Sequence, residues 1–382
     1  MSRFSFATGL AAGAVLGLAL AALLGLVIGS DEDSAEEQAR KVIEANYFEP
    51  VDAADLEGAS IRGMVSELRQ RYDDRFSHYF SPEQLDEFEA ATSGRFSGIG
   101  LNVAEVKQGL RVSSVIPETP ADRAGLEEGD LIVAVDGRSI AGVPADISTS
   151  RIQGPPGSEV ELRVEPAGGG PPRELTLERA EVRVPAVQSA LRQVDGRRVA
   201  YVHLHTFSSG AHGELRDTIE RLYRRGAEGL VLDLRGNGGG LLNEAVLTSS
   251  LFVEDGTVVS TESRAQGERE YEATGDALDP RPTVVLTDRN TASAAEILAS
   301  SLSDYDLATL VGTRTFGKGT FQEVIHLPAG GALDLTVGEY LTADGVSLAN
   351  KGISPDVRAA DDVDTQRDEA LQKALSVLAP EL

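Results

Sequence analysis

The chain has 382 residues, of which 41% are hydrophobic and 25% are charged, as expected for a globular protein of two or three domains. Its 61 acidic residues outnumber its 35 basic residues, and the net charge is −26 at pH 7. This charge argues against binding to nucleic acid and against docking to an anionic membrane surface, because both need clustered Lys and Arg. The chain has no cysteine, which excludes disulfides, thiol catalysis and thiolate zinc sites.

The amino-terminal residues 1–30 predict a membrane anchor. The uncharged run Phe4–Ser30 has 27 residues, more than the roughly 20 that a helix needs to cross a bilayer. Arg3 precedes the run and acidic residues follow it, so the amino terminus should stay in the cytoplasm. We therefore expect a single-pass protein of the cell membrane with an extracytoplasmic body, on the periplasmic or cell-wall side. The alternative is a cleaved signal peptide, which would make the protein secreted.

Residues 31–95 predict a helical arm, and residues 96–180 predict a small β-rich domain. In the arm, Ala35–Tyr47 and Ile61–Tyr72 have apolar residues at helical spacing, and Pro82 opens another helix. In the β-rich domain, short alternating strands are separated by Gly, Pro and Asp; we expect them at Leu110–Val115, Leu131–Val135, Val160–Val164 and Glu174–Leu177. The run 168–172 is typical of a hairpin tip.

Residues 181–360 predict an α/β core, because strands alternate with helices along the chain. The expected strands are Val199–Leu204, Gly229–Leu234, Thr283–Thr287 and Ala308–Val311, and the expected helices are Leu241–Phe252 and Ala292–Ser303. A terminal helix is expected within residues 361–382, over Asp364–Leu378. The predicted fold class is therefore a multidomain α/β or α+β protein.

Two stretches of the core indicate hydrolytic chemistry. Ser293 stands among small residues at a loop-to-helix start, and Lys318 stands between Gly317 and Gly319 without an adjacent carboxylate. A lysine whose charge has little support can lose its proton near neutral pH and then deprotonate a serine hydroxyl. The alternative for the serine is structural, because Ser293 with Glu296 also fits a helix capping box.

The lysine stretch also resembles a phosphate-binding loop. Residues 312–319 nearly match the pattern Gly-x-x-x-x-Gly-Lys-Ser/Thr. Gly319 replaces the hydroxyl residue that would hold Mg²⁺, and the β-like segment Thr320–Leu327 follows where a helix would be needed. These two departures argue against a nucleotide site.

A third stretch suits stabilisation of an acyl intermediate. The strand ending at Asp233 continues into the glycine-rich turn 236–240 and then a helix. Such a turn exposes backbone N–H groups, which suit an oxyanion hole, although many glycine-rich turns only relieve steric crowding. His203 and His205 should share one face of a strand, but no third ligand has recognisable spacing, so we expect structural or surface roles and no metal or other cofactor.

Residues 120–137 closely resemble the core of PDZ domains associated with proteases. With Leu230–Leu242, Ser293 and Lys318, they make the chain similar to the carboxyl-terminal processing, or tail-specific, proteases of the S41 serine peptidase family. The resemblance covers about residues 40–360. It implies a PDZ domain placed before a crotonase-like α/β protease core.

The resemblance also implies roles for individual residues. The family has its lysine 25 residues after the serine and a glutamine four residues after the lysine, as at positions 293, 318 and 322 here. It therefore implies that Ser293 is the nucleophile, Lys318 the general base and Gln322 the residue that orients the lysine. The backbone N–H groups of Gly239 and Ala294 would form the oxyanion hole. Gly238 stands where the family usually has proline, which leaves this loop more flexible.

The expected activity is cleavage of proteins or peptides whose free, apolar carboxyl terminus the PDZ domain captures. The carboxylate would bind the loop formed by Gly98, Ile99, Gly100 and Leu101. The resemblance further suggests that the helical arm and the terminal helix make contacts in a homo-oligomer. The alternative function is that of a non-catalytic PDZ scaffold at the membrane.

Overall fold

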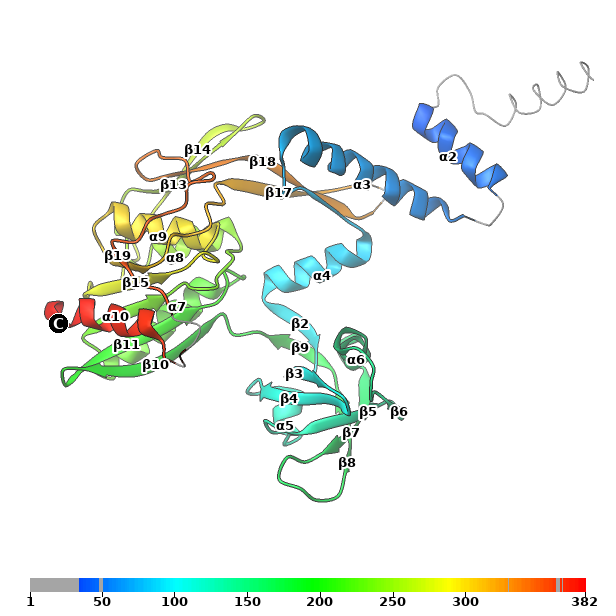
Figure 1. Ribbon diagram of the computed structural model, residues 1–382, viewed down its shortest axis with the longest axis horizontal. Helices are drawn as coiled ribbons and strands as arrows, with labels where there is room; N and C mark the ends of the chain where they lie inside the picture. The colour runs from blue at the N-terminus through cyan, green and yellow to red at the C-terminus, as the bar shows by residue number, and fades with distance from the viewer. Residues whose placement is uncertain (1–33, 48–50, 329, 362–364, 366) are drawn as a thin grey trace, which may run out of the picture. The chain divides into compact units, whose positions relative to one another are not determined.

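The structure is a computed structural model, and it describes residues 34–47, 51–328, 330–361, 365 and 367–382 (Figure 1). The predicted membrane anchor, residues 1–30, lies outside this range. Among the described residues, no helix has the length and apolar character needed to span a membrane. The chain divides into two compact units, one of residues up to Glu83 with Gln322–Thr336 and one of Gln84–Phe321 with Val337–Leu382.

The first unit contains the two helices predicted for the arm. α2 (Ala35–Asn46) begins after Ser34, whose side chain accepts from the Glu37 N–H, and α3 (Ala53–Tyr72) begins after Asp52, which caps it in the same way. α3 therefore starts well before the predicted Ile61. The short strand β1 (His78–Phe80) pairs antiparallel with residues 332–334 of β18 (Ala332–Thr342).

α4 (Pro82–Ser93) opens at the proline as predicted, and the chain then continues into the β-rich domain of the second unit. There β2 (Arg95–Gly98) pairs with β9 (Ala180–Arg183). The main sheet has the order β3-β4-β5-β7-β8, with β6 beside β5. Its elements are β3 (Leu101–Val106), β4 (Gly109–Val115), β5 (Leu131–Val135), β6 (Arg138–Ser139), β7 (Glu159–Glu165), β8 (Arg173–Glu178) and the helices α5 (Pro120–Arg123) and α6 (Ala145–Ile152). The four strands predicted from sequence are confirmed to within a residue at each end.

The α/β core is built on a six-stranded sheet of order β10-β11-β12-β15-β16-β19. In this sheet the five strands β11, β12, β15, β16 and β19 run parallel to one another, and β10 is antiparallel to β11. The strands are β10 (Val187–Val194), β11 (Arg197–Leu204), β12 (Gly229–Asp233), β15 (Thr283–Thr287), β16 (Thr309–Gly312) and β19 (Val357–Arg358). Parallel strands place all their carboxyl ends at one edge of the sheet, which is the usual site of function in open α/β folds.

Helices cover both faces of this sheet, which explains the nearly continuous apolar runs of its strands. On one face, Leu230, Leu232 and Val285 pack with α7 (Ala211–Arg224), α8 (Leu242–Ser249) and α9 (Ala294–Asp304). On the other face, Val231 and Val284 pack with α10 (Glu369–Leu378) (Figure 1). α10 is shorter than predicted, because Asp368 caps its start by accepting from the Leu371 N–H. A single turn, η1 (Ala379–Glu381), ends the chain.

A separate antiparallel sheet carries the segments next to the lysine. Within the second unit, β13 (Thr257–Ser263) pairs with β14 (Gly267–Glu272) and with residues 338–342 of β18. β17 (Thr320–His326) pairs with β18. β17 agrees with the β-like character expected after Lys318, and a strand rather than a helix follows the lysine loop.

Candidate active site

Ser293 lies in the turn between β15 and α9, at the carboxyl-terminal edge of the parallel sheet. Its φ of 56° and ψ of −120° place a non-glycine residue outside the common backbone regions. Such a conformation costs of order 1–3 kcal/mol and persists only where surrounding contacts impose it; it is typical of functional sites. Ser293 is also buried, with only 7% of its surface exposed. The backbone therefore distinguishes this serine from an ordinary helix cap.

Glu296 joins the serine turn to the lysine loop. Its Oε2 atom accepts from the backbone N–H of Ser293 at 3.0 Å and from that of Lys318 at 2.9 Å. Its Oε1 atom accepts from the Gly317 N–H at 2.8 Å and from the Thr315 hydroxyl. The carboxylate is fully buried. The capping role expected for Glu296 is confirmed, and its bridge to the lysine loop, which the sequence does not reveal, holds both backbones on one oxygen atom.

The two glycines beside Lys318 are required by close packing of the backbone. A Cβ on Gly319 would lie 2.0 Å from the Ala349 nitrogen, and one on Gly317, whose φ is +83°, would lie 2.8 Å from the Gly352 nitrogen. No side chain fits at Gly319, so this position has a steric reason to lack the hydroxyl of a phosphate loop. The lysine itself is half-buried.

The two phenylalanines near the lysine, Phe316 and Phe321, differ in their exposure. Phe316 is 57% exposed, and its backbone N–H donates to the Thr291 carbonyl. Phe321 is partly buried against the core, and its ring lies 5.4 Å from that of Tyr340. Burial raises the pKa of Tyr340 to about 12, although the nearby Ser293 side chain lowers it. Tyr340 is a neighbour of the serine that no sequence pattern indicated.

The glycine-rich loop lies directly against the serine turn. A Cβ on Gly239, whose φ is +104°, would lie 2.9 Å from the Ser293 Cβ and 3.0 Å from the Ala294 nitrogen. The Gly239 N–H donates to Asn237 Oδ1 at 2.9 Å. Asn237 is fully buried, its side-chain amide donates to the Leu204 carbonyl, and its own carbonyl accepts from the Ala292 N–H. Asn237 thus fixes the loop against the turn and engages one of the expected oxyanion donors.

Ala294 is the first residue of α9, where the backbone N–H has no acceptor inside the helix. It is 1% exposed. The two expected oxyanion donors, Gly239 and Ala294, therefore lie next to each other and next to Ser293.

Arg235, at the start of the glycine-rich turn, ties this edge to the terminal helix. It contacts Asp233 at 2.6 Å and Asp368 at 2.9 Å. Burial lowers the pKa of the Arg235 guanidinium, but hydrogen bonds with Asp233 and Asp368 outweigh it and raise the pKa. Arg235 therefore holds a permanent positive charge that neutralises the buried carboxylate at the end of β12.

The two strand histidines face the same side, as predicted, with ring centroids 4.0 Å apart. His203 Nε2 contacts the Arg235 carbonyl oxygen at 3.0 Å. Burial, with a smaller contribution from His203, lowers the pKa of His205. Within the described ranges, no three His, Cys, Asp or Glu side chains gather as a metal site would require.

Gln322 belongs to the first unit, where its Nε2 donates to the Thr336 hydroxyl at 3.1 Å. In the β-rich domain, the expected carboxylate loop turns sharply at Gly100, whose φ is +89° and whose Cβ would lie 2.3 Å from the Thr119 hydroxyl oxygen. The Ile99 carbonyl accepts from the Ala121 N–H and the Gly100 carbonyl from the Ile116 N–H. Gly98 ends β2, and Leu101 begins β3, which is the edge strand of its sheet.

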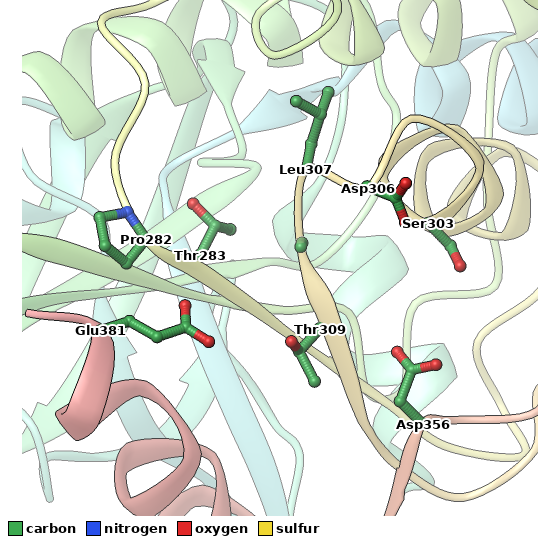
Figure 2. Close-up of a pocket in the computed structure, with 9 residues that line it drawn as sticks. Pro282, Thr283, Ser303, Asp306, Leu307, Thr309, Asp356 and Glu381 are labelled. Carbon is green, nitrogen blue, oxygen red and sulfur yellow. The ribbon is translucent and has the colours of Figure 1, made fainter.

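The pocket in Figure 2 lies away from this edge. It has a volume of about 460 Å³ and is lined by the first residues of β15 and β16, Thr283 and Thr309, with Asp306 after α9. These are the amino ends of the parallel strands, whereas Ser293 follows the carboxyl end of β15. The pocket is therefore separate from the candidate site.

Comparisons with known proteins agree with this organisation. The model of peptidase family S41 matches residues 198–359, and a PDZ domain model matches residues 111–166. The carboxy-terminal processing protease CtpA of Bacillus subtilis is 35% identical over 323 residues, covering 84% of this chain and 68% of that protein. A carboxyl-terminal-processing protease of Synechocystis is 35% identical over 295 residues, covering 76% and 69%.

A solved structure of a photosystem II D1 C-terminal processing protease has a TM-score of 0.51 and 32% sequence identity. The match covers 88% of this chain and 92% of that one. The chain therefore belongs to the S41 family of serine peptidases and has the PDZ domain and α/β core of its carboxyl-terminal processing proteases.

Proposed function

We propose that the chain hydrolyses peptide bonds with Ser293 as nucleophile, Lys318 as general base and Gln322 as the residue that orients the lysine. The observation that carries this proposal is the shared Glu296 oxygen, which accepts from the backbone N–H groups of both Ser293 and Lys318. The strained φ of Ser293 is further support, because a capping serine needs no such conformation.

In the proposed mechanism, neutral Lys318 takes the proton of the Ser293 hydroxyl as the serine oxygen attacks the scissile carbonyl. The protonated lysine then gives this proton to the leaving amine, and water hydrolyses the acyl-enzyme. The oxyanion accepts from the N–H groups of Ala294 and Gly239. Because Gly239 N–H donates to Asn237 Oδ1, it must share or exchange that bond when the oxyanion forms.

A fluorophosphonate probe tests the dyad, because it reacts with an activated serine. We expect the probe to label the full chain and not Ser293→Ala, and we expect Lys318→Ala to lose turnover with an unchanged circular dichroism spectrum. No labelling of the folded wild-type chain would favour the alternative of a PDZ scaffold. Wild-type turnover by Lys318→Ala would contradict the dyad.

We propose that substrates are proteins or peptides with a free, apolar carboxyl terminus. The open edge of β3 supports addition of the substrate as a further strand, with its carboxylate at the Gly98–Leu101 loop. Amidation of a substrate's carboxyl terminus should therefore raise its KM. Unchanged cleavage of the amidated peptide would remove this role of the loop.

The proposed location is the cell membrane, with the catalytic body extracytoplasmic, based on the charges around the run Phe4–Ser30. Extraction of membranes at alkaline pH would separate an anchored chain from a secreted one. We also propose that the arm mediates a homo-oligomer, because it exposes Ile43 on α2, Tyr47 directly after α2, and Met64 on α3. Light scattering of the full chain and of Ile43→Glu would test this.

A further inference from the structure

A hydrogen-bonded relay within the first unit leads from the end of the helical arm to Gln322. Gln322 Nε2 contacts the Thr336 hydroxyl oxygen at 3.1 Å, and this oxygen lies 3.0 Å from Asp74 Oδ1. Asp74 follows directly after α3 and its αL cap at Asp73. Residues far apart in the sequence therefore meet at one threonine hydroxyl.

Asp74 acts only as an acceptor in this relay. Its Oδ1 accepts from the N–H groups of Phe76 at 3.0 Å and Ser77 at 3.2 Å, and its Oδ2 accepts from the Ser77 hydroxyl. Burial raises the pKa of Asp74, but the hydrogen bonds from Ser77, Phe76 and Thr336 outweigh it and lower the pKa. An ionised carboxylate has no proton to donate.

The order of protons in the relay follows from this. Thr336 has one hydroxyl proton, and an ionised acceptor binds it more strongly than an amide does. With that proton directed to Asp74, the hydroxyl can only accept from the amide of Gln322. The amide nitrogen must therefore face Thr336, which turns the carbonyl oxygen Oε1 away from it.

We propose that Asp74 and Thr336 are positioning residues that fix the orientation of the Gln322 amide, with Nε2 held on the Thr336 hydroxyl and Oε1, an acceptor, on the opposite side. This inference rests on the proposed function, in which Gln322 orients Lys318. An ammonium or amine group of lysine needs an acceptor to hold it, and the opposite amide orientation would offer two N–H donors instead. The end of the helical arm thereby contributes to the chemistry without touching substrate.

Substitutions at Thr336 separate this role from a structural one. Thr336→Val keeps the shape and removes the hydroxyl, so we expect kcat to fall about 10- to 100-fold, part of the usual contribution of a positioned base, with little change in KM. Thr336→Ser keeps the proton order and should stay within about threefold of wild type. Ser77→Ala is the matched control: it removes bonds to Asp74 and to the Thr336 N–H, but it leaves the hydroxyl relay in place. It should lower Tm while kcat stays within about twofold.

A double-mutant cycle tests whether Thr336 acts through Gln322. In the full chain, Thr336→Val should cost little further activity once Gln322→Ala is present, because the two residues act as one unit. Additive losses, or wild-type kcat in Thr336→Val beside an impaired Gln322→Ala, would overturn the relay alone. A fully active Gln322→Ala would instead contradict the proposed role of Gln322 and the relay with it. If Ser77→Ala lost as much activity as Thr336→Val, the bonds around Thr336 would have only a structural role, and the proposed positioning of Gln322 would be wrong.

Discussion

Replacing Gly239 by alanine should uncouple the glycine-rich loop from the serine. The new Cβ would lie 2.9 Å from the Ala292 carbonyl oxygen and from the Ser293 Cβ, and 3.0 Å from the Ala294 nitrogen. Two of these three atoms belong to the backbone, so the loop must shift by several tenths of an ångström. The φ of +104° adds strain for any L-residue. Together we expect a loss of about 2–4 kcal/mol in unfolding free energy.

The same shift displaces both of the proposed oxyanion donors, the N–H groups of Gly239 and Ala294. Losing one such donor typically costs about 10²–10³ in kcat, so Gly239→Ala should lose at least that much, with a smaller change in KM. Gly238→Ala is the control in the same loop: a Cβ there has no atom within 4 Å, and the backbone is not left-handed. It should raise the unfolding free energy by about 0.4–1 kcal/mol and keep its activity.

Peptide cleavage and urea unfolding of both variants provide the measurement. Activity within threefold of wild type in Gly239→Ala would refute the assignment of this loop to the oxyanion hole. Equal losses in the two variants would indicate that loop flexibility, rather than close approach at Gly239, limits catalysis.

Three further predictions concern other residues of the second unit. Glu296→Gln leaves one acceptor oxygen for four donors, so the free energy of unfolding should fall by about 2–6 kcal/mol. Labelling of Ser293 by the fluorophosphonate probe should also be lost. Labelling at the wild-type level would contradict the role of Glu296 in joining the serine turn to the lysine loop. Gly319→Ser completes the phosphate-loop pattern but forces a Cβ to 2.0 Å from the Ala349 nitrogen, so it should lower Tm without creating ATP binding in calorimetry. Burial, together with the neighbouring Asp344 carboxylate, raises the pKa of Asp304 to about 6. Protonated Asp304 therefore stabilises the folded state at low pH, and this stabilisation is lost as pH rises from about 4 to 6. Asp304→Asn should therefore reduce the fall in Tm between pH 4 and pH 7, and an unchanged pH profile would show that Asp304 titrates normally.

The parallel strands were predictable, and Ser293 and Lys318 could be proposed as catalytic, because these signals are local in the sequence. Buried strands such as Thr283–Thr287 have an apolar centre and are followed by turn residues. The 25-residue spacing between Ser293 and Lys318 can be counted from the sequence alone. The family motifs then assign roles to Ser293 and Lys318. The antiparallel strands β13 and β14 were missed, since β14 is mostly exposed and rich in charged residues. α7 was also missed; Gly210 precedes it without a side-chain cap.

The contacts that organise the site could not be predicted, because they join residues distant in the chain. The bonds from Glu296 to Gly317 and Lys318 cross from α9 to a loop beyond β16, and Tyr340 reaches Ser293 from β18. The exposure of Phe316 was also hidden, since an aromatic residue beside a lysine has the same pattern whether it covers the lysine or faces solvent. The residue types and their spacing therefore indicate the chemistry of the site, whereas its geometry depends on hydrogen bonds between residues distant in the chain.

The strained backbone of Ser293 sets stability against the proposed activity, because the φ that a serine adopts here lowers the stability of the folded state. Glycine adopts positive φ without steric cost, so Ser293→Gly should produce an inactive protein that resists urea better than the active enzyme does. Selection for heat resistance alone would then drive this position away from serine. The inactive glycine form should also outlast Ser293→Ala, which keeps the strain, when the protein is used to capture its natural substrates.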